Sequence, residues 1–140
     1  LYLLSVFYLL ALYFSLFRNV VSHRRETKTT LGYKGEKLER AIRAHSNFCE
    51  TVPFNLFLSL ILYFNNYHFI CFLSLLIMCV GRRIHANSIS NVNEDLKKRR
   101  IGMRLTVTSY SILILGILYY IGNIIYFYIL SKTFSTTILP

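Results

Sequence analysis

Long uncharged stretches, separated by basic clusters, are the feature of this sequence that most limits its fold. The run from Leu105 to Ser131 contains no Asp, Glu, Lys or Arg, and neither does the run from Phe54 to Gly81. Residues 1–17 are also uncharged. A helix needs about 20 apolar residues to cross the hydrocarbon core of a bilayer. The pattern therefore predicts an all-α integral membrane protein.

The composition agrees with this prediction and excludes other classes. Charged residues make up only 16% of the chain, whereas a soluble domain carries about 25%. The hydrophobic fraction of 54% is too high for a disordered protein. Three scattered cysteines do not favour a secreted disulfide scaffold. The length of 140 residues predicts a single domain, 1–140.

Four transmembrane helices account for the uncharged runs, at about residues 1–17, 39–64, 67–87 and 104–130. The run from Phe54 to Gly81 is too long for one span, and Asn65-Asn66-Tyr67 predicts a turn inside it. The first helix is short and does not begin with Met, so we expect a few residues to precede it. A cleaved signal peptide is an alternative, but a basic n-region and a small-residue cleavage site before Arg18 are lacking.

The basic residues define the expected orientation. Eight of the sixteen lie between Arg18 and Arg43 and seven between Arg82 and Arg104. Cytoplasmic loops are enriched in Lys and Arg, so we assign loops 18–38 and 88–103 to the cytoplasm and both termini to the opposite side. In a bacterium this would be the inner membrane. The net charge of +10 alone would suggest a nucleic-acid partner. We exclude one because no folded basic domain remains outside the spans.

A polar stripe interrupts the apolar pattern at the start of the second span. At 100° per residue, Arg40, Arg43, Asn47 and Glu50 share one helix face. A charge at the bilayer centre costs about 2.5–3.5 kcal/mol, so Glu50 should face the bundle and have a partner. Arg43 is the candidate. The stripe is either an Arg–Glu clamp that fixes helix packing or a pocket for a zwitterionic or anionic ligand.

Two further polar groups are expected at the same membrane face. Gly81-Arg82-Arg83-Ile84-His85 closes the third helix, and the segment 97–104 opens the fourth. We interpret the cysteines in the third span as inert packing residues, and the four histidines form no cluster with metal-ligand spacing. Gly116 and Gly122 are expected to permit close helix contacts.

At the polar stripe the sequence resembles the MAPEG family, the membrane-associated proteins in eicosanoid and glutathione metabolism. The family pattern E-R-x-x-R-A-x-x-N-x-x-E-x-x-P is met at the start of the second span. The likeness extends over nearly the whole chain and is greatest to the small bacterial branch. The matching residues are Glu39, Arg40, Arg43, Ala44, Asn47, Glu50 and Pro53, with Gly81, Arg82 and His85 agreeing further along.

The resemblance implies a four-helix subunit in a homotrimer, with glutathione between neighbouring subunits at the cytoplasmic side. The family arginine that activates the glutathione thiol would correspond to Arg100 or Arg104. Ile89 and Thr51 stand where some family members have tyrosines, so prostaglandin or leukotriene synthesis is not expected. The residues implied to bind glutathione are Arg24, Arg43, Asn47, Glu50 and His85.

We therefore expect a membrane-embedded glutathione-dependent transferase or peroxidase that acts on lipophilic electrophiles or hydroperoxides. Its partners would be a second and third copy of itself, membrane lipids and a lipophilic small molecule. The alternative is a non-enzymatic MAPEG-like protein in which the Arg–Glu stripe serves trimer packing. Transport of a small anion has little support, because the polar groups gather at one face and form no path across the membrane.

Overall fold

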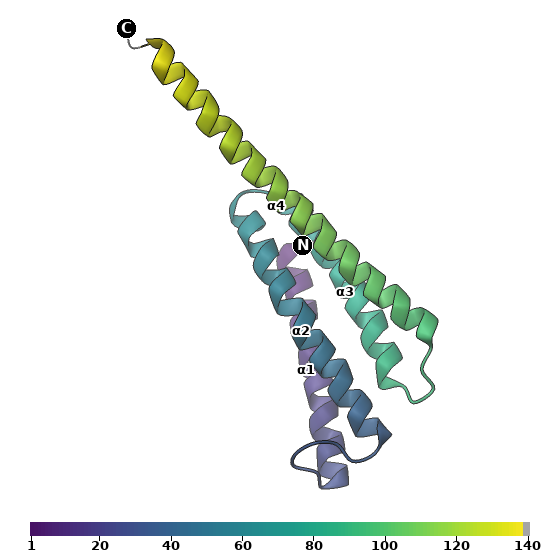
Figure 1. Ribbon diagram of the computed structural model, residues 1–140. Coiled ribbons are helices and arrows are strands. Elements are labelled where there is room, and N and C mark those ends of the chain that lie inside the picture. The colour runs from purple at the N-terminus through teal and green to yellow at the C-terminus, as the bar shows by residue number, and fades with distance from the viewer. Residues whose placement is uncertain (139–140) are drawn as a thin grey trace.

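The protein is an all-helical bundle in the computed structural model, which describes residues 1–138, with side chains for residues 1–133. Within the described chain there is no strand. The connections between the helices are short. The four helices are α1 (Tyr2–Thr27), α2 (Glu36–Phe64), α3 (His68–Ser90) and α4 (Leu96–Ile138) (Figure 1).

Each of the four helices is long and apolar enough to cross a membrane. Large apolar side chains on the outside of the bundle are exposed, among them Leu4 and Phe7 on α1 and Phe54 and Phe57 on α2. In water such a surface would drive aggregation, whereas in lipid it costs nothing because acyl chains are equally apolar. The protein is a multi-pass integral membrane protein.

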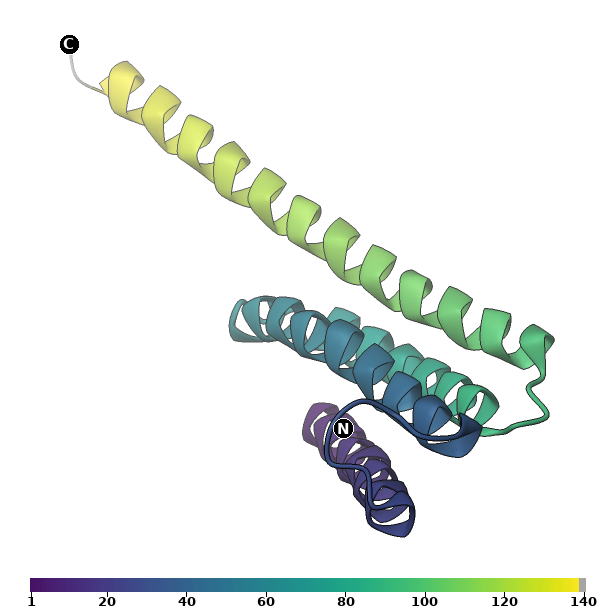
Figure 2. The same cartoon turned by 60° about the horizontal axis from the view of Figure 1, so that its bottom comes forward.

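Helices α2 and α3 form the centre of the bundle. Helix α1 packs against both of them, and α4 packs against α3 and, over a smaller area, α2. Figure 2 shows α1 and α4 on opposite sides of this pair, and among the described residues these two outer helices do not contact each other. Each outer helix is therefore free to contact lipid or another subunit along most of its surface.

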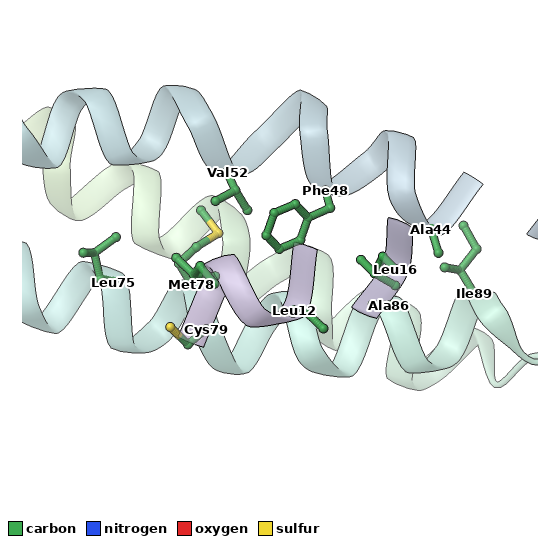
Figure 3. Packing of buried hydrophobic residues seen from close by; sticks show 11 residues of the cluster. Leu12, Leu16, Ala44, Phe48, Val52, Leu75, Met78, Cys79, Ala86 and Ile89 are labelled. Atoms are coloured by element: carbon green, nitrogen blue, oxygen red, sulfur yellow. The ribbon is translucent and has the colours of Figure 1, made fainter. Parts of the chain in front are cut away.

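The apolar core lies between α1, α2 and α3. Leu12 of α1 is buried there, and Phe48 and Val52 of α2 point toward Met78 of α3 (Figure 3). At the opposite end from the basic loops, the ring of Tyr2 stacks on Tyr63 with centroids 4.4 Å apart. The start of α1 and the α2–α3 turn therefore lie at the same end, as four antiparallel spans require.

Helix α1 is longer than predicted. It continues through the basic segment to Thr27, where the prediction ended it at residue 17. A charged residue is costly in hydrocarbon, so the basic segment ends the part of the helix that lies in the membrane. Arg and Lys favour a helix in water, so the helix itself continues beyond the membrane. The helix ends at Lys28, whose left-handed conformation (φ 49°) lets its N–H bond back to carbonyls of the last turn. The connection to α2 is thus residues 28–35, in place of 18–38.

Helix α4 also begins earlier than the predicted residue 104, for a reason visible at Asp95. The Asp95 Oδ1 accepts hydrogen bonds from the backbone N–H groups of Lys97 (2.9 Å) and Lys98 (3.2 Å), as an N-cap residue does. Residues 91–95, and not 88–103, therefore connect α3 to α4. The helix passes the predicted end at residue 130, and its C-terminal part extends beyond the other three helices (Figure 1).

A close contact between α3 and α4 depends on Gly81 and Gly102. A Cβ on Gly102 would lie 2.7 Å from the backbone N of His85 and 2.8 Å from the Gly81 oxygen. Gly116 has a looser contact with side-chain tips of Leu62 and Ile70. Gly122 has nothing within 4 Å, so its expected close contact is absent within the described part of the subunit.

Candidate functional site

A polar hollow opens where the start of α2, the end of α3 and the start of α4 meet, at the end of the bundle that carries the basic residues. Its volume is about 420 Å³, within the ~300–1,000 Å³ range of small-ligand pockets. It carries three guanidinium groups and three carboxylates, so its charge is mixed. The hollow is lined by Glu36, Glu39, Arg40, Arg43, Asn47, Ile89, Glu94 and Arg99.

One wall of the hollow is an ion-pair network centred on Glu94. Its carboxylate accepts from Arg99 at 2.9 Å and from Arg40 at 3.2 Å, and Arg40 also pairs with Glu36 at 2.8 Å. Partial burial of Glu94 raises its pKa, but hydrogen bonds from Arg99 and Arg40 outweigh burial and hold the pKa below its ordinary value. The network ties the α3–α4 connection to α2 through Arg40 and to α4 through Arg99.

The other wall offers unpaired groups to a ligand. Arg43 and Asn47 lie there together, as their spacing predicted, and Glu39 lies one turn before Arg43. Among residues 1–133, neither Arg43 nor Glu39 makes an ion pair. A free guanidinium, a free carboxylate and an amide side by side suit a zwitterionic ligand, because Arg binds carboxylates and a carboxylate binds an ammonium.

Glu50 differs from its prediction. It is exposed on α2, outside the hollow, and within the described part of the subunit it forms no ion pair with Arg43. The two residues are seven positions apart, about 10 Å along the helix axis, which is too far for a direct contact. The predicted Arg43–Glu50 pairing is therefore wrong within one subunit, and both side chains face outward.

Arg24 is half-buried at the end of α1 and also lies outside the hollow. Its Nη1 donates to the backbone oxygens of Thr29 (3.4 Å) and Thr30 (3.1 Å). The guanidinium thus holds the α1–α2 connection against the last turn of α1, and its remaining N–H groups are left to contact other molecules.

The two alternatives for thiol activation, Arg100 and Arg104, lie on a different surface. Both are exposed and line a hollow of about 300 Å³ with Lys97 and Ile101. Arg99 is the α4 residue that faces the polar hollow of α2, and sequence reasoning missed it. The signal was a cluster of four consecutive basic residues, in which only the helix register decides which one points inward.

His85 and Arg82 lie buried beside the hollow. His85 is 2% exposed and its Nε2 has no hydrogen-bond partner among the described residues. Arg82, 1% exposed, donates from Nη1 to Thr51 Oγ1 (3.0 Å) and to the Asn47 backbone oxygen (3.3 Å). Its Nε and Nη2 have no hydrogen-bond partner among the described residues. A buried cation with spare donors and no carboxylate nearby favours a neighbouring anion.

Thr51 and Ile89 stand where some members of the family that the sequence resembles have tyrosines. Ile89 is buried and gives the hollow an apolar wall without a hydroxyl. Thr51 accepts from Arg82, and its backbone oxygen accepts from the hydroxyl of Tyr110. Thr51 therefore holds the Arg82 guanidinium of α3 against α2 and connects α2 to α4 through Tyr110.

Residues 2–119 match the family model of the MAPEG family, which is most of the chain and includes every residue of the hollow. The chain belongs to the MAPEG family. MAPEG proteins are membrane bundles, and the family includes glutathione transferases and peroxidases as well as non-enzymatic members. Comparisons with curated proteins and with solved structures gave no significant match. Membership confirms the predicted family and fold class, and leaves the activity to be argued from the site.

Proposed function

We propose that this MAPEG protein is a membrane-embedded glutathione-dependent transferase or peroxidase that acts on lipophilic electrophiles or hydroperoxides. The observation that carries the proposal is the hollow at α2, in which Arg43, Asn47 and Glu39 are free to bind. Glutathione is a zwitterion with two carboxylates, one ammonium, peptide groups and a thiol. These groups complement a free guanidinium, an amide and a carboxylate.

In this proposal Arg43 and Asn47 of the hollow bind and orient glutathione together with three residues outside it. Arg43 and Arg24 would hold its carboxylates, while Asn47 and Glu50 would hold its ammonium or peptide groups. His85, with its free Nε2, would accept or donate one further hydrogen bond. Arg43 and Glu50 are exposed in a single subunit, so we propose that a neighbouring subunit of a homotrimer completes the site.

The reaction follows from the thiol that glutathione supplies. In the transferase reaction the thiol loses its proton and its sulfur bonds to an electrophilic carbon, which releases its leaving group with the electron pair of the broken bond. In the peroxidase reaction two glutathione thiols are oxidised to one disulfide, and the hydroperoxide is reduced to an alcohol and water. A thiol has a pKa of about 8.5 in water, and a nearby cation lowers that pKa. Arg100 or Arg104 is proposed to supply this cation from an adjacent subunit. The protein would then contribute position and charge, not a covalent nucleophile.

The orientation of the protein is part of the proposal. The connections 28–35 and 91–95, with the basic helix ends beside them, would face the cytoplasm, in agreement with the positive-inside rule. The hollow lies at this end, where glutathione dissolved in the cytoplasm reaches it directly. The lipophilic substrate would approach through the membrane, along the exposed apolar surface of the helices.

The test is direct binding of glutathione to the purified, detergent-solubilised oligomer by calorimetry. We expect saturable binding below millimolar concentration, and loss of binding in Arg43→Ala but not in Arg25→Ala, a control at an exposed arginine outside the hollow. No binding at millimolar glutathione, with the oligomer intact, would rule the proposal out. The non-enzymatic alternative, in which the stripe serves trimer packing, would then stand.

A further inference from the structure

We infer that the outward groove between α1 and α3 binds one anionic phospholipid. The acyl chain would lie in the apolar half of the groove, and the phosphate would lie against Arg83 and Arg18. None of the groove residues lines the glutathione hollow, so this inference does not rest on the proposed enzymatic function.

The half of the groove nearer the start of α1 is apolar. It is a hollow of about 510 Å³, and its only charged lining residue is Arg83, at one end. Cys79 and Ser5 meet at its base, where the Cys79 thiol donates to the Ser5 backbone oxygen at 3.5 Å. Its walls are formed mainly by Leu4, Tyr8, Phe72, Leu76, Val80 and Ile84.

The half nearer the cytoplasmic end is polar and basic. It is a hollow of about 520 Å³ that also includes Arg83, so the two halves meet at this residue. Arg18 is its second cation. The apolar residues Leu12, Leu16 and Ala86 also line it. Its hydroxyl and amide groups come from Ser15, Asn19, Ser22, Asn87 and Ser90.

The two arginines lack a counter-anion. Both are exposed, and neither makes a hydrogen bond or an ion pair with any residue among 1–133. Glu26 contacts Ser22 of the polar half, but its carboxylate is already hydrogen-bonded to Ser22 at 3.2 Å and to His23 at 3.0 Å. The polar half therefore carries an uncompensated positive charge that complements a phosphate group.

The length of the apolar half favours a lipid over a free phosphate. From Phe72 to Arg83 the groove runs about 16 Å along α3, at 1.5 Å per residue. The hydrocarbon core of a bilayer is about 30 Å thick, so this length equals one leaflet. A lipid whose phosphate meets Arg83 at the membrane surface can lay one acyl chain along the whole apolar half.

The experiment uses the full chain in a neutral detergent, titrated with phosphatidylglycerol or with phosphatidylcholine of the same acyl chains. Native mass spectrometry measures bound lipid per subunit. We expect one phosphatidylglycerol per subunit, bound several-fold more tightly than phosphatidylcholine. Soluble glycerol phosphate at millimolar concentration should not compete, because it has no acyl chain.

Variants in each half separate the two contributions. Arg83→Gln and Arg18→Gln should each weaken the binding of phosphatidylglycerol by about fivefold, since each arginine near the membrane surface contributes about that factor to the affinity for an anionic lipid. The binding of phosphatidylcholine should be unchanged. Arg25→Gln, at an exposed arginine outside the groove, is the matched control. Val80→Trp fills the apolar half and should weaken the binding of both lipids. Leu73→Trp, on the same helix but outside the groove, should weaken the binding of neither.

Four results would overturn the inference. The first is equal binding of the two lipids, and the second is an unchanged preference in both arginine variants. The third is displacement of phosphatidylglycerol by glycerol phosphate, which would make the site an anion site only. The fourth is cross-linking of subunits through Leu4→Cys that phosphatidylglycerol does not block. This result would assign the groove to a second copy of the chain.

Discussion

Gly102 of α4 lies directly over the backbone of His85 of α3, so that a Cβ on this glycine would come within 2.7 Å of the His85 amide nitrogen. This contact brings α4 against the end of α3 that carries the buried His85 and Arg82. It also fixes the position of Arg99 along the bundle axis, because Arg99 lies three residues before Gly102, and so places Arg99 at the polar hollow. The glycine thus links helix packing to the candidate site.

Gly102→Ala should destabilise the bundle by about 1–3 kcal/mol, because the new methyl group would meet two backbone atoms and the His85 Cβ, none of which can move aside. Thermal unfolding in detergent measures the change. Gly122→Ala is the control, because nothing lies within 4 Å of that position and alanine favours a helix. Equal melting temperatures for the two variants would contradict the contact.

Thr51→Val should destabilise the protein by about 1–3 kcal/mol, because valine keeps the shape but removes the hydroxyl that accepts from the buried Arg82 guanidinium. The unfolding free energy is again the measurement. Thr108→Val serves as the control, since Thr108 is exposed and its hydroxyl bonds only to the Arg104 oxygen of its own helix. Similar losses of unfolding free energy in both variants would show that the hydrogen bond between Arg82 and Thr51 does not stabilise the protein.

The Glu94 network should make stability depend on acid pH. The pKa of Glu94 is lower in the folded protein than in the unfolded chain, so its contribution is full above the ordinary glutamate pKa and is lost as pH falls through the folded value. Melting temperatures between pH 7 and pH 3 should therefore fall more steeply in the wild type than in Glu94→Gln. Glu39→Gln, which removes no ion pair among the described residues, should keep the wild-type slope.

Arg43→Ala distinguishes the two proposed roles of the polar stripe. If Arg43 binds a glutathione carboxylate, the variant should bind glutathione at least tenfold more weakly, because a charged hydrogen bond contributes about 1.5–3 kcal/mol. The melting temperature of the oligomer should stay nearly unchanged, since Arg43 is exposed and makes no ion pair with a described residue of its own subunit. Dissociation of the oligomer in this variant would favour the packing role.

Orientation can be tested with single cysteines in a variant whose three native cysteines are replaced. Val92→Cys lies in the α3–α4 connection and Asn66→Cys in the α2–α3 turn, at opposite ends of the bundle. In sealed inner-membrane vesicles with the cytoplasmic face outward, an impermeant maleimide should label position 92 and spare position 66. The reverse pattern would invert the proposed topology.

The sequence by itself determined the class of fold and the family. Uncharged runs of membrane length require helices, because an unpaired backbone group is too costly in hydrocarbon. The Asn65-Asn66 turn lies where the sequence predicted it, between Phe64 and His68. The fixed spacing of Arg40, Arg43 and Asn47 predicted a shared helix face, and all three line one hollow. Such features depend on local periodicity, which the sequence displays directly.

Only the tertiary structure decided which charges are paired and which are free. Arg40 and Arg43 are alike in sequence, yet Arg40 pairs with Glu94 of the α3–α4 connection and Arg43 does not. Arg99, and not Arg100 or Arg104, faces the hollow, because the helix start at Asp95 and the Gly102 contact fix the register of α4. These outcomes depend on contacts between distant segments, and a lysine and arginine cluster contains no local signal for them.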